Sequence, residues 1–334
     1  MTATQADVAA AAGVAPKTVS NVINGYPHIS EGVRQRVNEA IVRLDYRPNH
    51  AARSLRSGQN KVIGLAVPEL DVSYFAELAR LVVERAEDIG LDVVIMQTLG
   101  ARQRELAVVT GKNTRFVDGL IYSPVSLGTE DLPAPSRRLP VVLLGERTGG
   151  GGQYNHVGID NVAAAHAATA HLLDRGRRRV AFIGSQPDDP QSAIARLRLN
   201  GYRDALTAAD LVPLANLVIA THGYHRQDGA AAAERLLAQH GGAPDAIFCA
   251  TDLLALGALR TLLSHGIRVP DDIALIGLDD IEEGRFSTPT LSTIAPDKQT
   301  IARQAVERLA SLIVAASPAA DDIIDFSIQI RESS

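Results

Sequence analysis

The chain has one cysteine, Cys249, among 334 residues, and it has no tryptophan. A single thiol excludes a disulfide bond within the chain, which fits a protein of the reducing cytoplasm. The sequence shows no basic and apolar signal segment, and no apolar run approaches the about 20 residues that span a bilayer. We therefore expect neither export nor membrane insertion, which counts against an exported binding protein.

The sequence also lacks the motifs of common enzyme classes. Residues 149–152 are all glycine, but no Lys-Ser/Thr pair follows them, so a flexible connection is a better interpretation than a phosphate-binding loop. His222 and His225 have no acidic or cysteine partner at the spacing of a zinc site. The carboxylates of 279–283 have no recognisable nucleophile or triad beside them. We expect no enzymatic activity, no cofactor and no bound metal.

The N-terminal region does contain the pattern of two short helices joined by a tight turn. Thr4 and Asp7 have the spacing of a capping box for a first helix that ends at Ala12, and Gly13 supplies the left-handed turn after it. Pro16 suits the first position of a second helix, where its missing N–H has no partner to lose. This segment alone also fits an ordinary helical hairpin of an enzyme.

Polarity and charge favour DNA binding by these helices. Thr18, Ser20 and Asn21 leave the outer face of the second helix polar, which is typical of a helix-turn-helix motif. Residues 1–61 contain eight Lys and Arg against four Asp and Glu, about +4, whereas the whole chain carries −5. A basic head on an acidic body is expected when only one end of the chain meets phosphate.

Beyond Gly58, short apolar runs alternate with amphipathic helices in two successive sets. This alternation predicts two α/β lobes with parallel sheets, and the chain length fits a small head plus two such lobes. Open parallel sheets bind ligands at the carboxyl ends of their strands, so we expect a cleft between the lobes. The expected strands are 61–67, 91–96, 119–122, 141–144, 180–184, 217–220, 246–250 and 273–278, and the expected helices are 75–89, 101–113, 163–175, 192–208, 227–240 and 253–265.

A third helix is expected after its capping residue Ser30, and a basic segment, 46–58, follows it. Taken together, these features resemble the lactose-repressor family of bacterial transcription regulators. The resemblance covers essentially the whole chain. The residues that carry it are Asp7-Val8-Ala9, Ala12-Gly13-Val14, Thr18-Val19-Ser20, Val22, Asn24 and the run Tyr46-x-Pro48-Asn49-x-x-Ala52-Arg53-x-Leu55.

The resemblance implies an all-α helix-turn-helix head, a hinge and a body of two parallel-sheet lobes like those of periplasmic binding proteins. It also implies that the chain crosses three times between the lobes, with 297–316 as the helix that returns to lobe 1 and 323–330 as a strand of lobe 2. The expected ranges are 1–47 for the head, 48–60 for the hinge helix or linker, 61–334 for the body, about 61–159 and 292–320 for lobe 1, and 160–291 and 321–334 for lobe 2.

For DNA, the resemblance places Pro16, Lys17 and Asn21 on the groove-facing surface of the second helix. Lys17 can donate to guanine or contact a phosphate instead, and Asn21 can pair with adenine. Ala15 stands where a capping serine is usual, which removes one N-cap hydroxyl. Leu55 would be a wedge in the minor groove, or else part of a linker helix packed on the body. The expected DNA-binding residues are Pro16, Lys17, Thr18, Ser20, Asn21, His28, Ser30, Asn49, Arg53 and Leu55.

For the cleft, the resemblance assigns effector contacts to Arg198 and to Asp279, which follows a predicted strand. A guanidinium group suits paired sugar hydroxyls or a carboxylate. Thr251 replaces the more usual asparagine, which argues against a lactose-like set of contacts, and Tyr224 would offer a stacking face. A surface salt bridge or an ordinary core position is the alternative for each of these residues. The expected effector-binding residues are Ser73, Tyr74, Phe75, Arg198, Tyr224, Thr251 and Asp279.

These expectations describe a homodimeric, cytoplasmic, nucleoid-associated repressor of carbohydrate-utilisation genes. It would bind double-stranded operator DNA and release it when a small sugar-type inducer binds. A repressor that needs a purine-type corepressor is the alternative. A sugar-binding transport protein and a nucleotide-using enzyme are the rivals from other classes, and the absent signal segment and phosphate loop count against them.

Overall fold

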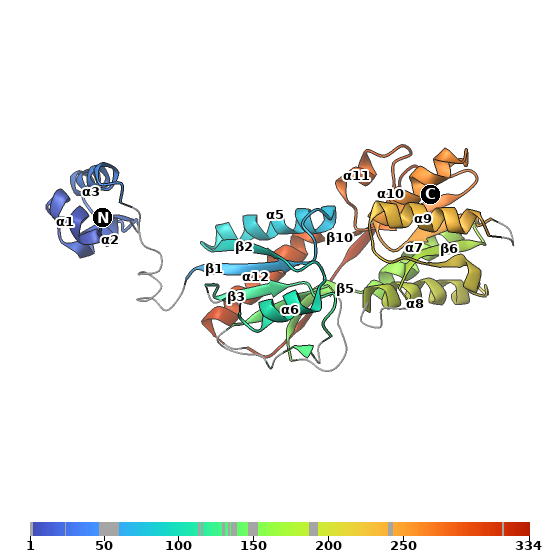
Figure 1. Cartoon of the computed structure of the whole chain (residues 1–334), viewed down its shortest axis with the longest axis horizontal. Helices are drawn as coiled ribbons and strands as arrows, with labels where there is room; N and C mark the ends of the chain where they lie inside the picture. Colours follow the sequence, from blue (N-terminus) through green and yellow to red (C-terminus); the bar gives the residue numbers. More distant parts are fainter. Residues whose placement is uncertain are drawn as a thin grey trace. The chain divides into compact units, whose positions relative to one another are not determined.

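The computed structural model describes residues 3–23, 25–46, 60–112, 114, 116–128, 131–132, 134, 139–145, 153–186, 193–239, 243–315 and 317–334. The chain forms two compact units, the head, Met1–Asn60, and the body, Lys61–Ser334. Figure 1 labels many of the elements of both units. No helix within the described residues is both long and apolar enough to cross a membrane.

The head consists of three helices, α1 (Gln5–Ala12), α2 (Pro16–Ile23) and α3 (Glu31–Arg43). The predicted capping box of α1 is present, because Asp7 N donates to Thr4 Oγ1 over 3.3 Å and Thr4 N donates to Asp7 Oδ2 over 2.8 Å. Gly13 ends α1 with a φ of +65°, as predicted. Ser30 does precede α3, but its side chain makes no capping hydrogen bond. Fully buried valines from all three helices, Val8, Val19 and Val37, form the core.

Lobe 1 contains a six-stranded parallel sheet in the order β11-β5-β4-β3-β1-β2. Residues of β1, which lies between β3 and β2, enter two different cores on the two faces of the sheet. Ile63 and Leu65 pack with α5 and α12, whereas Ala66 faces the cluster that includes residues of α6. The elements are β1 (Val62–Val67), α5 (Ser73–Asp88), β2 (Asp92–Gln97), α6 (Arg102–Val109), β3 (Gly119–Tyr122), β4 (Val141–Leu144), β5 (Asn155–Ile159), α12 (Lys298–Val314) and β11 (Asp321–Ile324).

Lobe 2 contains a second six-stranded sheet in the order β12-β10-β9-β8-β6-β7, which is parallel except for β12. Its helices pack in pairs, α7 against α8 and α9 against α10. The elements are α7 (Asn161–Asp174), β6 (Val180–Ser185), α8 (Ala193–Ala208), a 3-10 turn (Ala215–Leu217), β7 (Val218–Ala220), α9 (Arg226–Leu237), β8 (Ala246–Cys249), α10 (Asp252–Ser264), β9 (Ala274–Leu278), α11 (Glu282–Arg285), β10 (Ser292–Pro296) and β12 (Phe326–Gln329).

The chain crosses between the lobes three times, at Asp160, Asp297 and Asp325. Two of the crossings touch, because Asp297 N donates to the Asp325 carbonyl over 3.2 Å. The predicted lobe boundaries are wrong at the second and third crossings. β10 belongs to lobe 2, and β11 belongs to lobe 1. The single strand expected at 323–330 is two short strands in different sheets, because the chain leaves one sheet and enters the other at Asp325.

Two strands, β5 and β10, have no counterpart in the sequence-based prediction. Asn155 and His156 of β5 and Ser292 and Thr293 of β10 are polar residues that are nevertheless buried. A strand that buries polar side chains shows no apolar run, and such a run was the signal used to identify strands. Both strands lead directly into a crossing, where polar side chains find hydrogen-bond partners.

Two glycines allow α9 and α10 to approach each other closely. A Cβ at Gly257 of α10 would lie 1.9 Å from the Arg226 carbonyl oxygen, and one at Gly229 of α9 would lie 2.1 Å from the Leu254 carbonyl oxygen. Real atoms cannot approach so closely, and the obstacle in each case is backbone. Glycine is therefore required on both helices for this packing.

We predict that Gly257→Ala destabilises the body by about 2 kcal/mol or more, because the two helices must separate. Chemical denaturation of the full chain measures this. Gly32→Ala in α3 is the matched control, since no atom lies within 4 Å of its Cβ position. It should leave the head as stable or stabilise it by about 0.5–1 kcal/mol. Equal effects of both substitutions would contradict the packing argument.

Candidate functional site

The helix α2 has one apolar side and one exposed end. Val19 and Val22 are buried in the head core, whereas Pro16 and Lys17 at the start of the helix are exposed. Thr18, Ser20 and Asn21 are half-buried along its sides, and His28 and Ser30 are exposed in the following turn and at the start of α3. Asn49, Arg53 and Leu55 of the predicted hinge lie outside the described residues.

Contacts around the two ends of α2 fix this surface. Gln5 of α1 donates its side-chain amide to the Pro16 carbonyl over 2.8 Å, although Ala15 offers no capping hydroxyl. The Tyr26 and His28 rings meet edge to face with centroids 5.5 Å apart, and Arg34 donates to the Tyr26 carbonyl. The turn that carries His28 is thus held by contacts to α3, and the role of His28 toward DNA stays a prediction.

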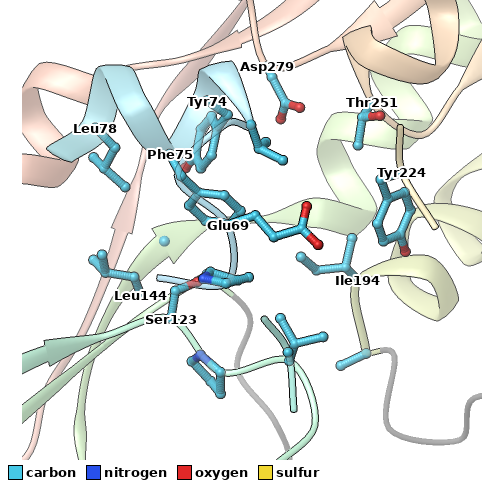
Figure 2. Close-up of a pocket in the computed structure, with 18 of the residues that line it drawn as sticks. Glu69, Tyr74, Phe75, Leu78, Ser123, Leu144, Ile194, Tyr224, Thr251 and Asp279 are labelled. Atoms are coloured by element: carbon cyan, nitrogen blue, oxygen red, sulfur yellow. The ribbon is translucent and has the colours of Figure 1, made fainter. Parts of the chain in front are cut away.

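The body contains a cavity that residues of both lobes line. Its volume of ≈ 340 Å³ is within the range typical of small-molecule sites. Figure 2 shows Tyr74 and Phe75 on one side of the cavity and Thr251 and Tyr224 on the other. Six of the seven predicted effector residues line it, which are Tyr74, Phe75, Arg198, Tyr224, Thr251 and Asp279. Their role in binding stays a prediction.

Ser73 is the exception among the predicted effector residues. It does not line the cavity, and its hydroxyl donates to Glu283 Oε1 of lobe 2 over 2.5 Å. Ser73 does not reach the cavity because it is the first residue of α5, where the helix begins beside the contact between the lobes. Ser73 therefore joins the lobes, whereas the next two residues, Tyr74 and Phe75, turn an aromatic pair toward the cavity.

Arg198 is buried in α8 and is held by two acceptors. Its Nε donates to Asn161 Oδ1 over 2.9 Å, and its Nη1 donates to the Ala250 carbonyl. Asn161 begins α7 just after the first crossing, and Ala250 follows β8. Asn161 also lines the cavity. Sequence reasoning did not identify Asn161, because the strand before it, β5, lacked a recognisable pattern.

Asp279 lies just after β9, with its carboxylate directed toward the cavity (Figure 2). Its backbone has a φ of +126°, a conformation that non-glycine residues rarely adopt. Burial raises the pKa of Asp279 to about 6, against the opposing effects of Arg198 and Lys298. A carboxylate that accepts hydrogen bonds, next to a guanidinium group that donates them, can bind the hydroxyls of a neutral ligand.

Asp252, the first residue of α10, holds the loop that carries Asp279. The fully buried Asp252 carboxyl accepts from Thr293 Oγ1 of β10 over 2.7 Å and from Ile281 N over 3.0 Å. Burial, and next the charge of Asp279, raise the pKa of Asp252 to about 8, although both hydrogen bonds lower it. Asp252 is therefore largely protonated at neutral pH. Sequence reasoning overlooked it in favour of its neighbour Thr251.

Polar contacts join the lobes beside the cavity. Glu77 of α5 accepts from Glu282 N of lobe 2 over 3.1 Å. Lys298 of α12 pairs with Glu77 and also donates to the Asp280 carbonyl over 3.0 Å. At the cavity itself, Glu69 of lobe 1 lies 3.0 Å from His225 Nε2 of lobe 2. Sequence reasoning missed Glu69 and His225 as lining residues, because a loop carboxylate and a lone histidine carry no recognisable pattern.

No group of three or more His, Cys, Asp or Glu side chains suited to a metal ion occurs within the part of the chain that the structure describes. The cavity lining combines carboxylates, one guanidinium group, histidines, aromatic rings and apolar side chains.

Comparisons with known proteins match both units of the chain. Residues 4–49 match the model of "Bacterial regulatory proteins, lacI family", and residues 169–334 match a "Periplasmic binding protein-like domain". The ribose operon repressor of Escherichia coli (strain K12) is 34% identical over 315 residues, which cover 92% of each protein. The chain belongs to the lacI family of bacterial regulatory proteins.

Solved structures agree with this membership. A lac repressor dimer bound to operator and the anti-inducer ONPF matches all of the chain and 99% of that structure, with a TM-score of 0.85 and 28% identity. A complex of the transcriptional regulator CelR with cellobiose matches 99% of the chain and all of that structure, with a TM-score of 0.72 and 29% identity. This lacI-family chain thus has the predicted helix-turn-helix head and two-lobed α/β body.

We predict that Asp252→Asn removes a pH dependence of stability between pH 6 and 8. The folded-state pKa of about 8 lies above the usual 3.8, so the folded protein retains a proton that the unfolded chain has lost. The free energy of unfolding therefore falls as pH rises toward 8, by about 1.4 kcal/mol per pH unit for one such group. Asp279 also lowers the free energy of unfolding as pH rises, but only up to about pH 6, which is its folded-state pKa.

Urea denaturation of the full chain at pH 6, 7 and 8 measures this slope. The asparagine can accept from Ile281 N and donate to Thr293 Oγ1, so the variant keeps the loop in place. Asp204→Asn, on the exposed side of α8, should retain the slope of the unmodified chain. Identical slopes for the unmodified chain and Asp252→Asn would show that Asp252 is not the titrating group.

Proposed function

We propose that this chain is a homodimeric repressor that binds operator DNA through α2 and is released from it by a sugar-type effector in the body cavity. The observation that carries the proposal is the cavity, which is lined by Arg198 and Asp279 of lobe 2 and by the aromatic pair Tyr74 and Phe75 of lobe 1. The guanidinium group can donate hydrogen bonds to the hydroxyls of a sugar, and the carboxylate can accept hydrogen bonds from them. The aromatic rings can pack against the apolar C–H faces of the sugar.

The relatives support both halves of this proposal. The lac repressor neighbour is a dimer bound to operator, a relative is named for the ribose operon, and the CelR neighbour binds cellobiose. A dimer is also what a single helix-turn-helix requires, because one such motif reads only a half-site. The proposed place of action is chromosomal DNA in the cytoplasm, and the proposal involves no catalysed reaction.

The lobe contacts suggest how a ligand in the cavity changes DNA binding. Glu69 and His225 join the lobes at the cavity, and Ser73 and Glu283 join them beside it. A ligand that touches both lobes favours one angle between them over another. In a dimer, that angle would set the spacing of the two hinges and so the affinity for operator, and operator would reciprocally weaken effector binding.

For the head, we predict that Lys17→Ala and Asn21→Ala change base preference at symmetric positions of a near-palindromic site. Each lost bidentate contact would remove about 1–3 kcal/mol of discrimination. Selection of binding sequences from genomic DNA by the full chain, repeated with each variant, measures this. Lys112→Ala, an exposed lysine of the body, should leave the selected sequence unchanged. Uniform weakening on all sequences would mean that Lys17 and Asn21 position the head without reading bases.

For the cavity, we predict that Arg198→Ala and Asp279→Asn bind operator but respond poorly to effector. Losing one partner of a buried, charge-assisted hydrogen bond costs about 2 kcal/mol, or roughly 30-fold in effector affinity. A thermal-shift screen of sugars, sugar derivatives and purines identifies the effector, and calorimetry then compares the variants with the surface control Asp204→Asn. If both variants bind the effector as the unmodified chain does, the cavity is not the regulatory site.

A further inference from the structure

Two carboxylates enter the cavity from opposite lobes. Glu69 lies in the loop between β1 and α5, with its side chain 30% exposed, and Asp279 follows β9. Figure 2 shows the Glu69 carboxylate extending into the cavity between Phe75 and the side that carries Tyr224. A ligand in this space therefore meets hydrogen-bond acceptors from both lobes.

The described lining of the cavity contains little positive charge. Among the described lining residues, Arg198 is the one arginine and there is no lysine. Its Nε and Nη1 donate to Asn161 and Ala250. Its positive charge also stabilises the ionised carboxylate of Asp279 and so lowers the Asp279 pKa. The ammonium of Lys298 is 5.9 Å from the centre of the Tyr74 ring, but it is held by Glu77 and the Asp280 carbonyl.

Two histidines also line the cavity, namely His222, which is exposed, and His225. His225 Nε2 lies 3.0 Å from Glu69 Oε2, so the His225 ring is already in contact with a carboxylate of the protein. Beyond the carboxylates, lobe 1 contributes an apolar wall, which includes Leu78, Leu144 and Ile301. An anionic group of a ligand would lose water against this wall without gaining a partner.

We propose that Glu69 is a recognition residue that favours polyhydroxy effectors without an anionic group and excludes their phosphorylated and carboxylated forms. This inference rests on the proposed effector function of the cavity. Ionised carboxylates only accept hydrogen bonds, so Glu69 and Asp279 would each accept from ligand hydroxyls and link the two lobes through the ligand. A phosphate or carboxylate group near Glu69 would meet like charge in a partly desolvated space, a repulsion that is a common source of specificity.

Calorimetric titration of the full chain with matched pairs tests this proposal. The probes are glucose and glucose 6-phosphate, ribose and ribose 5-phosphate, and cellobiose and cellobiose 6-phosphate. Native mass spectrometry after incubation with a small-molecule cell extract records the mass of any other bound ligand. We expect the neutral member of a responding pair, or a neutral compound from the extract, to bind at least about tenfold more tightly than its anionic form.

Glu69→Gln keeps the size of the side chain and removes its charge, so it should reduce this preference severalfold. Glu87→Gln, an exposed carboxylate at the far end of α5, is the matched control and should leave the preference unchanged. Tighter binding of an anionic form, or an unchanged preference in Glu69→Gln, would overturn the role of Glu69 while leaving the effector function intact. Absence of any bound small molecule in both measurements would instead contradict the proposed effector function, and this inference with it.

Discussion

The buried carboxyl of Asp252 connects the strand ends of lobe 2 to the contacts between the lobes. It holds Ile281 N and the hydroxyl of Thr293, and so fixes the loop between β9 and α11 against β10. That loop carries Asp279 in its rare backbone conformation and presents the Asp280 carbonyl to Lys298 of lobe 1. One protonated acid thereby supports both the cavity and the lobe contact beside it.

The protonated state of Asp252 matters because Asp279 is close enough for its charge to raise the Asp252 pKa. Two ionised carboxylates in one buried region would repel each other, so a proton on Asp252 allows Asp279 to remain ionised above pH 6. Asp279 can then accept hydrogen bonds from a ligand. The Asp252 carboxyl thus supports the loop, and the Asp279 carboxylate lines the cavity.

The cavity and the lobe contacts share residues or immediate neighbours in the chain. Ser73 joins Glu283 while Tyr74 and Phe75 line the cavity, and Glu69 both lines it and pairs with His225. A ligand cannot enter such a site without altering the forces between the lobes. This coupling is what a regulator needs if small-molecule binding is to change its affinity for DNA.

The sequence by itself determined the class of the fold and indicated most of the expected effector residues that line the cavity. Capping residues and apolar periodicity are local signals, so Thr4, Asp7 and Gly13 located α1, and apolar runs located most strands of the body. Motif residues likewise indicated Arg198 and Asp279. Only the tertiary structure decided where β10 and β11 belong, since strand pairing joins residues far apart in the chain. It also decided that Ser73 contacts Glu283, that Glu69 lines the cavity beside His225, and that Asp252 supports the loop after β9, because these contacts depend on elements that the local sequence does not specify.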